Sequence, residues 1–387
     1  MRRAELLLYL LLIVGEVAWA AFVPLGPVFE DRFDLSATET GALLSASSVA
    51  ILVVSWPAGV LADRFGARRL TLAGTGLMAA GMFAQAAPDF WSLLGARALF
   101  GVGFGIVWSA GVSLLAQVVP PARRSAALAL TITLAAVGMM VGPGYAGLLV
   151  DTVGTDLPFA ALGVVALVAA AGLLRTEGAA GEADQPDALS PVAALRAAAR
   201  HPIILGALVC MALPGFVNNA INLLVPLEMD ENGTSTAVIG LAYSVAAVLF
   251  VIQSGLVSRR AARLATLRVG ALGALVLAAV HLLPLVATTS AVLIVFLCVR
   301  TPANALLLPV SVPLAVRGAE EAGIGRGTVI GMLNGVWALA ATTGPLVAGG
   351  VADVAGPTAA YAGAGALALG CAAWLARVRA PVAVHVD

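Results

Sequence analysis

Residues 59–69 read Gly-Val-Leu-Ala-Asp-Arg-Phe-Gly-Ala-Arg-Arg and form a short charged segment between two long apolar runs. Gly59 and Gly66 allow a tight turn where the two runs meet. Asp63 lies among arginines, so its carboxylate can accept charge-assisted hydrogen bonds and reinforce a helix N-terminus. Such a cluster stabilises one conformation when its partners separate in another. We therefore expect a conformational latch at Gly59, Asp63, Arg64, Gly66 and Arg68.

The whole chain shares the apolar character of the runs beside this segment. Of its 387 residues, 61% are hydrophobic and 11% are charged, and the mean hydropathy is +1.01. Soluble domains are about 45–50% apolar and about 25% charged, so the composition indicates a polytopic membrane protein. A net charge of zero gives no electrostatic basis for nucleic-acid binding. Cys210, Cys298 and Cys371 are too widely spaced for a metal or redox motif, and we expect no metal and no cofactor.

The apolar runs are long enough to cross a bilayer repeatedly. A span needs about 20 mostly apolar residues, and a span within lipid must satisfy its own backbone, which favours helices. The sequence therefore predicts an all-α polytopic membrane protein with twelve transmembrane helices. They cover roughly 5–29, 40–62, 70–88, 91–118, 125–150, 158–174, 202–227, 237–257, 269–288, 290–316, 328–352 and 358–376.

The distribution of arginine supports twelve spans and predicts which ends of the helices face the cytoplasm. The chain has 21 basic residues, all of them arginine. With the amino terminus in the cytoplasm, all but Arg32, Arg97 and Arg300 lie on the cytoplasmic side, as the positive-inside rule requires. We expect a multi-pass protein of the cell inner membrane with both termini cytoplasmic. The amino-terminal run resembles a signal peptide, but its removal would leave an odd number of spans.

The two halves of the chain resemble each other. Gly142-Pro143-x-x-Ala146-Gly147, followed by Asp151 and Gly154, recurs 202 residues later as Gly344-Pro345-x-x-Ala348-Gly349, followed by Asp353 and Gly356. Such a repeat predicts two pseudo-symmetric six-helix bundles with a site between them. We expect an N-terminal bundle at 1–175, a cytoplasmic central loop at 176–201 and a C-terminal bundle at 202–387.

Three motifs resemble those of the major facilitator superfamily. Residues 59–69 resemble its loop between helices two and three, with Ala67 where a basic residue is usual. Arg97-x-x-Phe-Gly-x-Gly resembles its helix-four motif, with Phe100 in place of glutamine. The segment 138–147 resembles the helix-five motif associated with antiporters, with Ala146 for a glycine. The resemblance implies twelve helices, alternating access, a monomer and, less directly, export.

The helix-five motif also has a physical interpretation. Its glycines form a small-xxx-small stripe that lets two helices approach closely, and its proline bends the helix. This pattern suits a hinge or sliding contact between the two halves, although tight packing without motion would use the same residues. The predicted hinge consists of Gly138, Gly142, Pro143 and Gly147.

Charged residues within spans are costly and therefore candidates for function. Glu16 is 13 residues from Arg3, hence about 20 Å from the cytoplasmic edge. Arg97 enters from the other side, six residues after Trp91, hence about 9 Å deep. These depths nearly coincide in a slab of about 30 Å. We therefore predict a Glu16–Arg97 pair that takes part in proton coupling and substrate binding.

The seventh and tenth spans supply polar side chains from the other half. Pro214-Gly215 is expected to break the seventh span. Residues four apart share one helix face, so amide and guanidinium groups there can meet a ligand. Interhelical hydrogen bonding that is purely structural would use the same side chains. The predicted substrate-binding residues here are Asn218, Asn219, Asn222, Arg300 and Asn304.

These features predict a secondary active transporter that works by alternating access. The chain has no phosphate-binding P-loop, and its three histidines are too scattered for a catalytic site, so we expect no enzyme activity. The favoured function is proton-coupled efflux of a small amphipathic, drug-like compound, with Glu16 as the one deep acid. The alternative is an organic-anion symporter or exchanger, because Arg97 and Arg300 outnumber Glu16. The partners would be a small-molecule substrate, protons and the lipid bilayer.

Overall fold

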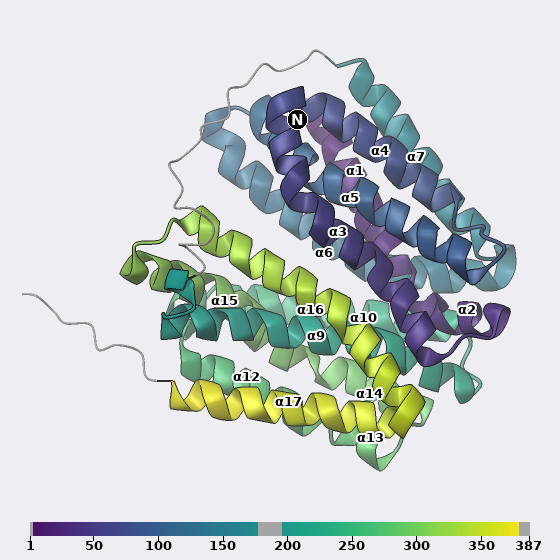
Figure 1. Ribbon diagram of the computed structural model, residues 1–387, viewed down its shortest axis with the longest axis vertical. Helices are drawn as coiled ribbons and strands as arrows, with labels where there is room; N and C mark the ends of the chain where they lie inside the picture. The colour runs from purple at the N-terminus through teal and green to yellow at the C-terminus, as the bar shows by residue number, and fades with distance from the viewer. Residues whose placement is uncertain (1–2, 177–195, 379–387) are drawn as a thin grey trace, which may run out of the picture.

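A computed structural model describes residues 3–176 and 196–378 (Figure 1). Within these ranges the chain is helical and contains no strand. The first bundle consists of α1 (Arg3–Ala21), η1 (Val23–Leu25), α2 (Gly26–Phe33), α3 (Ala37–Phe65), α4 (Ala67–Phe83), α5 (Phe90–Val118), α6 (Pro121–Val153) and α7 (Asp156–Leu174). The second consists of α9 (Pro202–Glu231), α10 (Thr236–Ser258), α11 (Ala261–Leu264), α12 (Leu267–Val280), α13 (Leu283–Val286), α14 (Ser290–Val299), α15 (Thr301–Ala322), α16 (Arg326–Ala355) and α17 (Pro357–Arg377).

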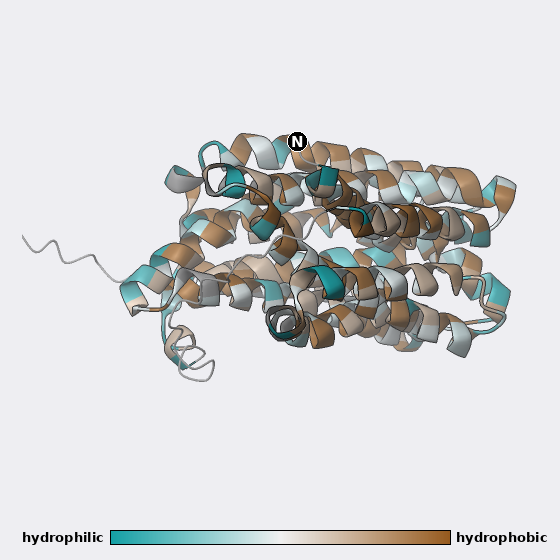
Figure 2. Ribbon diagram, turned by 90° about the horizontal axis from the view of Figure 1, so that it is seen from above, coloured by the Kyte–Doolittle hydropathy of each residue, from teal (hydrophilic) through white to brown (hydrophobic). Residues whose placement is uncertain are grey.

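The helices have the length and polarity of membrane spans. Eleven described segments, some of them two helices joined end to end, are long and apolar enough to cross a bilayer. The twelfth, α4, has 17 residues and is about 26 Å long, close to the hydrocarbon thickness. Hydrophilic residues gather towards the ends of the helices (Figure 2). The predicted all-α polytopic fold is confirmed.

Local sequence explains where several helices begin and end. Ser36 and Glu39 form a capping box at the start of α3, and Asp89 accepts a hydrogen bond from the Ser92 N–H at the start of α5. Gly154 and Gly356, which are equivalent in the repeat, end α6 and α16 with φ of 76° and 84°. Only glycine adopts this conformation without strain, so each half of the repeat ends the corresponding helix in the same way.

The expected break at Pro214 does not occur, since α9 is continuous from Pro202 to Glu231. A proline removes one hydrogen bond of the helix ladder, and a helix enclosed by neighbours tolerates this loss. Here α9 packs along both α15 and α16. At Gly215 the fit is close, because an added Cβ would lie 3.0 Å from the Trp337 ring. Packing thus keeps the helix continuous through the proline.

The two bundles meet along two equivalent helix pairs, α3 with α16 and α6 with α10 (Figure 1). In each pair a glycine of one bundle lies against a proline carbonyl of the other. A Cβ at Gly41 would lie 2.6 Å from the Pro345 carbonyl oxygen, and one at Gly240 would meet the Pro143 carbonyl oxygen. The sequence repeat therefore reappears as a two-fold pair of contacts between the bundles.

These contacts lie in one half of the molecule, from the middle of the helices to the end at which α3 and α10 begin and α6 and α16 finish. The described hydrogen bonds between the bundles include Ser45 Oγ to the Thr342 carbonyl at 2.8 Å and the Gly144 N–H to Ser244 Oγ at 3.0 Å. The remaining ones join Asp353 to the start of α3. We call this end the acidic end, because it carries Glu30, Asp31, Asp230, Glu231 and Asp353.

Candidate functional site

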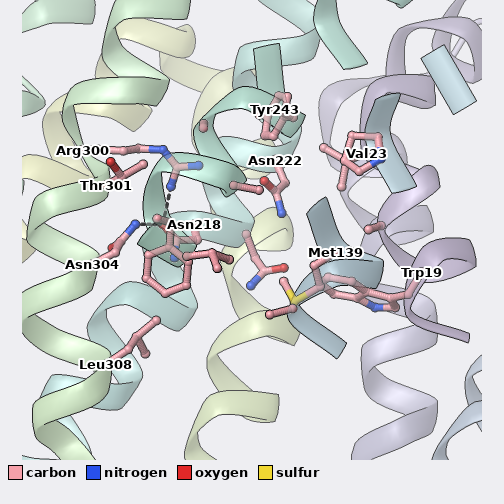
Figure 3. A pocket seen from close by; sticks show the side chains of 18 of the residues that line it. Trp19, Val23, Met139, Asn218, Asn222, Tyr243, Arg300, Thr301, Asn304 and Leu308 are labelled. Atoms are coloured by element: carbon pink, nitrogen blue, oxygen red, sulfur yellow. Dashed lines mark hydrogen bonds between the residues drawn. The ribbon is translucent and has the colours of Figure 1, made fainter. Parts of the chain in front are cut away.

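A cavity of about 160 Å³ lies between the bundles (Figure 3). Residues of α1, α6, α9, α10, α15 and α16 line it, together with Val23 of η1 and Arg300 between α14 and α15. Its lining consists of Trp19, Ala20, Val23, Ala136, Met139, Pro143, Asn218, Asn219, Asn222, Tyr243, Ala246, Ala247, Phe250, Val251, Arg300, Thr301, Asn304, Leu308 and Trp337. All five residues predicted for substrate binding on the seventh and tenth spans are among them.

The polar groups gather on the side of the second bundle. Arg300 Nη1 and Asn304 Nδ2, the latter at 3.0 Å, both donate to Asn218 Oδ1, as the dashed lines in Figure 3 show. Arg300 is only 7% exposed, and its Nε and the Asn304 Oδ1 have no hydrogen-bond partner in the described part of the chain. Unpaired buried polar atoms are uncommon in proteins, so the hydrogen bonding of this corner is incomplete in the structure described. We call Asn218, Arg300 and Asn304 the polar corner.

A one-residue interruption of the helix lies at this corner. Arg300 lies between α14 and α15 but keeps helical backbone angles (φ −77°, ψ −18°), so the predicted span over 290–316 continues through it as one segment from Ser290 to Ala322. Pro302 has no N–H for the Cys298 carbonyl, and the Thr301 hydroxyl donates to that carbonyl instead, at 2.8 Å. The backbone hydrogen bonds from Arg300 N–H to the Phe296 carbonyl and from Asn304 N–H to the Arg300 carbonyl continue the helix on both sides of the interruption.

The opposite side of the cavity is apolar and comes largely from the first bundle. Trp19, Val23 and Met139 face the polar corner across the cavity in Figure 3. Among the described lining residues, none is an aspartate or a glutamate. The cavity therefore combines a cationic corner with an apolar wall and has no acidic side chain on its surface.

The asparagines of α9 differ in their availability. Asn219 is buried, and its Nδ2 donates to the Gly215 carbonyl at 2.8 Å within the same helix. Asn222 also lines the cavity, and its amide makes no hydrogen bond to a residue that the structure describes. The Tyr243 hydroxyl donates to the Ile221 carbonyl at 2.8 Å. Asn222 is therefore the free amide of this helix.

The structure does not bring Glu16 and Arg97 together, and neither makes an ion pair with a described residue. Arg97 points to α3, where Nε donates to the Leu43 carbonyl at 3.4 Å and Nη2 to Ser47 Oγ at 2.9 Å. Glu16 instead lies against α6, because a Cβ at Gly138 would be 2.6 Å from the Glu16 Cβ. The Arg97 guanidinium lies over the Phe22 ring, six residues after Glu16. Gly15, next to Glu16, lies beside Phe104, seven residues after Arg97 on α5. The two charges are therefore offset along the helices and face different neighbours.

The helix-five motif contacts both bundles. A Cβ at Gly142 would lie 2.7 Å from the Val17 carbonyl oxygen of α1. One at Gly147 would lie 2.6 Å from the Thr236 carbonyl oxygen of α10. Gly138 of α6 also contacts α1, and Pro143 of α6 contacts α10. The motif therefore lets α6 pack closely against a helix on each side. Its role as a hinge stays a prediction.

The residues predicted as a latch surround the turn between α3 and α4. Gly66 has φ of 90°, which explains the glycine. Arg68 Nη2 donates to the carbonyls of Leu173, Leu174 and Thr176 at 2.8, 3.0 and 2.5 Å and so caps the end of α7. Arg64 lies over the Phe65 ring, Gly59 has no close neighbour, and the side chain of Asp63 lies outside the described part. The observed contact of Arg68 is therefore within the first bundle.

Two polar contacts were missed by sequence reasoning. Glu5 is 2% exposed and pairs with Arg123 at 3.1 Å, although it lies near the end of its span. Asp353, interpreted only as a loop acid, accepts hydrogen bonds from the N–H groups of Ala37 at 3.0 Å and Thr38 at 2.9 Å, and from the Thr38 hydroxyl. The repeat of Asp151 and Asp353 marked this residue, but its partners are more than 300 residues away in sequence.

Known proteins resemble this chain along most of its length. A sequence model described as Major Facilitator Superfamily matches residues 8–328. The human vesicular acetylcholine transporter is 27% identical over 343 residues, which are 84% of this chain and 63% of that protein. The quinolone resistance protein NorA of Staphylococcus aureus (strain MRSA252) is 26% identical over 150 residues, 38% of each chain. The chain spans less than two thirds of the length of the curated relatives it matches first.

Solved structures share the fold at low sequence identity. A bacterial homolog of the human lysosomal transporter Spinster, inward-facing and unoccupied, has a TM-score of 0.76 and 16% identity, covering 96% of this chain and 94% of that one. The human organic anion transporter MFSD10 (TETRAN) has a TM-score of 0.69 and 20% identity, covering 97% and 99%. Family and fold together identify a membrane transporter and not an enzyme. The chain belongs to the major facilitator superfamily.

Proposed function

We propose that this transporter carries a small amphipathic organic anion across the membrane by alternating access. The observation that carries the proposal is the polar corner, in which a buried arginine has no acidic partner among the described residues. A buried charge without a counter-charge is costly. An anionic ligand group at Arg300 would remove this cost, and the apolar wall would cover the rest of the ligand.

The chemistry of the corner selects a carboxylate-like group. A guanidinium presents several N–H donors in a plane, which matches the two oxygens of a carboxylate. Arg300 Nε has no partner in the described chain, and Asn222 offers a further amide. The printed name of MFSD10 describes an organic anion transporter with this fold, which supports the same substrate class.

The arrangement of the bundles supports a particular orientation of the cavity. The described hydrogen bonds between the bundles lie between the cavity and the acidic end, with those of Asp353 at the end itself, which supports a closed acidic side. The positive-inside rule assigns the arginine-rich end, with both termini, to the cytoplasm. We infer an inward-facing state in the cell inner membrane, with a monomer as the functional unit.

Transport into liposomes tests the proposal. Purified protein would be reconstituted, and uptake of radiolabelled benzoate and salicylate compared with uptake of a lipophilic cation. Arg300→Gln should lower anion uptake at least tenfold. Arg317→Gln, on the same helix but outside the cavity lining, is the matched control and should stay within twofold of the unmodified protein. Equal anion uptake by Arg300→Gln, or transport of the cation alone, would refute it.

A second candidate is proton-coupled efflux of a drug-like compound. It rests on two observations. Glu16 lies against Gly138 of the helix-five motif, and the chain is similar to NorA. An acid without an ion-pair partner in an apolar bundle can exchange a proton with solvent as the bundles move. Glu16→Gln should then abolish transport driven by a pH gradient while leaving exchange of bound substrate. Unchanged pH-driven transport by this variant would exclude Glu16 as the coupling residue.

A further inference from the structure

A second, smaller hollow lies beside the cavity, with a volume of about 10 Å³. It shares Trp19, Val23, Asn219 and Asn222 with the cavity and is completed by Leu44, Arg97 and Pro345. Both bundles therefore contribute to its surface. Its volume is close to the minimum that holds one water molecule, so it suits a small ion or a single functional group and excludes a drug-sized molecule.

Arg97 is the charged group of this hollow and is 1% exposed. Its acceptors are neutral, namely the Leu43 carbonyl and Ser47 Oγ, and its guanidinium carbon is 3.9 Å from the centroid of the Phe22 ring. Nη1 has no hydrogen-bond partner in the described part of the chain. The positive charge is thus buried. Among the described residues it has no ion-pair partner, and one of its N–H groups makes no hydrogen bond.

We propose that the hollow at Arg97 binds a small anion, which contacts the Arg97 guanidinium from the first bundle and the Asn222 amide from the second. The site is separate from the polar corner, because Arg97 does not line the larger cavity and Arg300 does not line the hollow. Both Arg97 and Asn222 can donate N–H groups, which excludes a cation and favours an anion. The proposal does not depend on the transport of an organic anion.

The anion has two possible sources with the same chemistry. Chloride from solution could enter the hollow, or the carboxylate of a small acid could do so from the adjoining cavity, since the two share four lining residues. Either anion would contact residues of both bundles. It would therefore stabilise the arrangement in which the bundles are close together at this depth.

Thermal unfolding of purified protein in lipid nanodiscs, without transport substrate, tests the site. Sodium gluconate would be replaced stepwise by sodium chloride or by sodium formate at constant ionic strength, because gluconate is too large for the hollow. We expect a saturable rise in Tm with at least one small anion. In Arg97→Gln the apparent affinity for that anion should fall at least tenfold, whereas Arg300→Gln should keep it.

The outcomes distinguish chloride from a carboxylate as the bound anion, and they distinguish the site at Arg97 from the proposed transport of an organic anion. A rise with chloride identifies a halide site, and a rise with formate alone identifies a carboxylate site. No rise with either anion, or an unchanged affinity in Arg97→Gln, would overturn the proposal while leaving Arg300-dependent uptake as evidence for the transported anion. If Arg97→Gln does not fold, Leu44→Phe narrows the hollow without touching the larger cavity and should weaken the same anion effect.

Discussion

Replacing Asp353 by asparagine should shift the transporter away from the state described here. The Asp353 carboxylate accepts hydrogen bonds from the Ala37 and Thr38 N–H groups and from the Thr38 hydroxyl, so α16 caps the start of α3 across the bundle interface. Loss of a helix cap costs about 0.5–2 kcal/mol, and an exposed charge at a helix end contributes about 0.3–1 kcal/mol. Asparagine keeps one acceptor oxygen, so we expect a net loss of about 1–2 kcal/mol, which changes a two-state ratio about 5–30-fold.

Distances between spin labels at the acidic end would measure this ratio. Leu157 on α7 and Val286 at the end of α13 are exposed residues in opposite bundles and are suitable for labelling. Asp353→Asn should enlarge the population with a long distance between the labels. Asp151→Asn is the matched control, because Asp151 is the equivalent residue of the repeat and makes no hydrogen bond or ion pair to a described residue.

The reasoning would be refuted by either of two results. Identical distance distributions in Asp353→Asn and in the unmodified protein would show that the cap does not stabilise the closed acidic end. Equal shifts in Asp353→Asn and Asp151→Asn would show that the effect comes from the acidic charge of the region and not from the hydrogen bonds to α3.

Three further predictions concern packing, a buried ion pair and pH. Gly240→Leu should abolish transport but keep the helical content by circular dichroism, because the new side chain meets the Pro143 carbonyl at the bundle interface. Arg123→Gln leaves buried Glu5 without its partner and should lower stability by about 1–3 kcal/mol, with recovery when Glu5 is also changed to glutamine. Hydrogen bonds from Ser92 lower the pKa of Asp89 in the folded protein. The ionised Asp89 cap therefore contributes stability that is lost as the pH falls through this folded-state pKa. The Tm difference between the unmodified protein and Asp89→Ala should shrink in acid.

Hydropathy and the repeat were sufficient to predict the spans and the two-bundle architecture. Each span has to cover a fixed thickness of hydrocarbon with apolar residues, so composition along the chain reports it directly. The glycine–proline motif was equally informative, because close approach of two helices leaves few residue types possible. The five polar residues of the seventh and tenth spans could be singled out for a related reason, since polar residues in a span need a partner or a cavity, and they line the cavity; their role in substrate binding stays a prediction.

The direction of side chains and the continuity of helices could not be predicted in the same way. Glu16 lies against α6, whereas Arg97 donates to α3 and lies over the Phe22 ring, and this arrangement depends on the packing of the whole bundle. Pro214 and Pro302 each remove one N–H, but only the second coincides with a one-residue interruption. The difference lies in their neighbours, because α9 is enclosed by other helices and Thr301 supplies a hydrogen bond that accommodates the interruption.

The glycine contacts between the bundles bear on which interactions set the activation barrier of the conformational change. At Gly41 and Gly240 the backbone lies against a backbone carbonyl, that of Pro345 and that of Pro143. Cα–H···O contacts of this kind are weak, about 0.5–1 kcal/mol each. The activation barrier of the exchange then depends on the few directional polar contacts at the acidic end. Evolution could alter the turnover of such a transporter by changing one carboxylate, without altering the surfaces along which the bundles move.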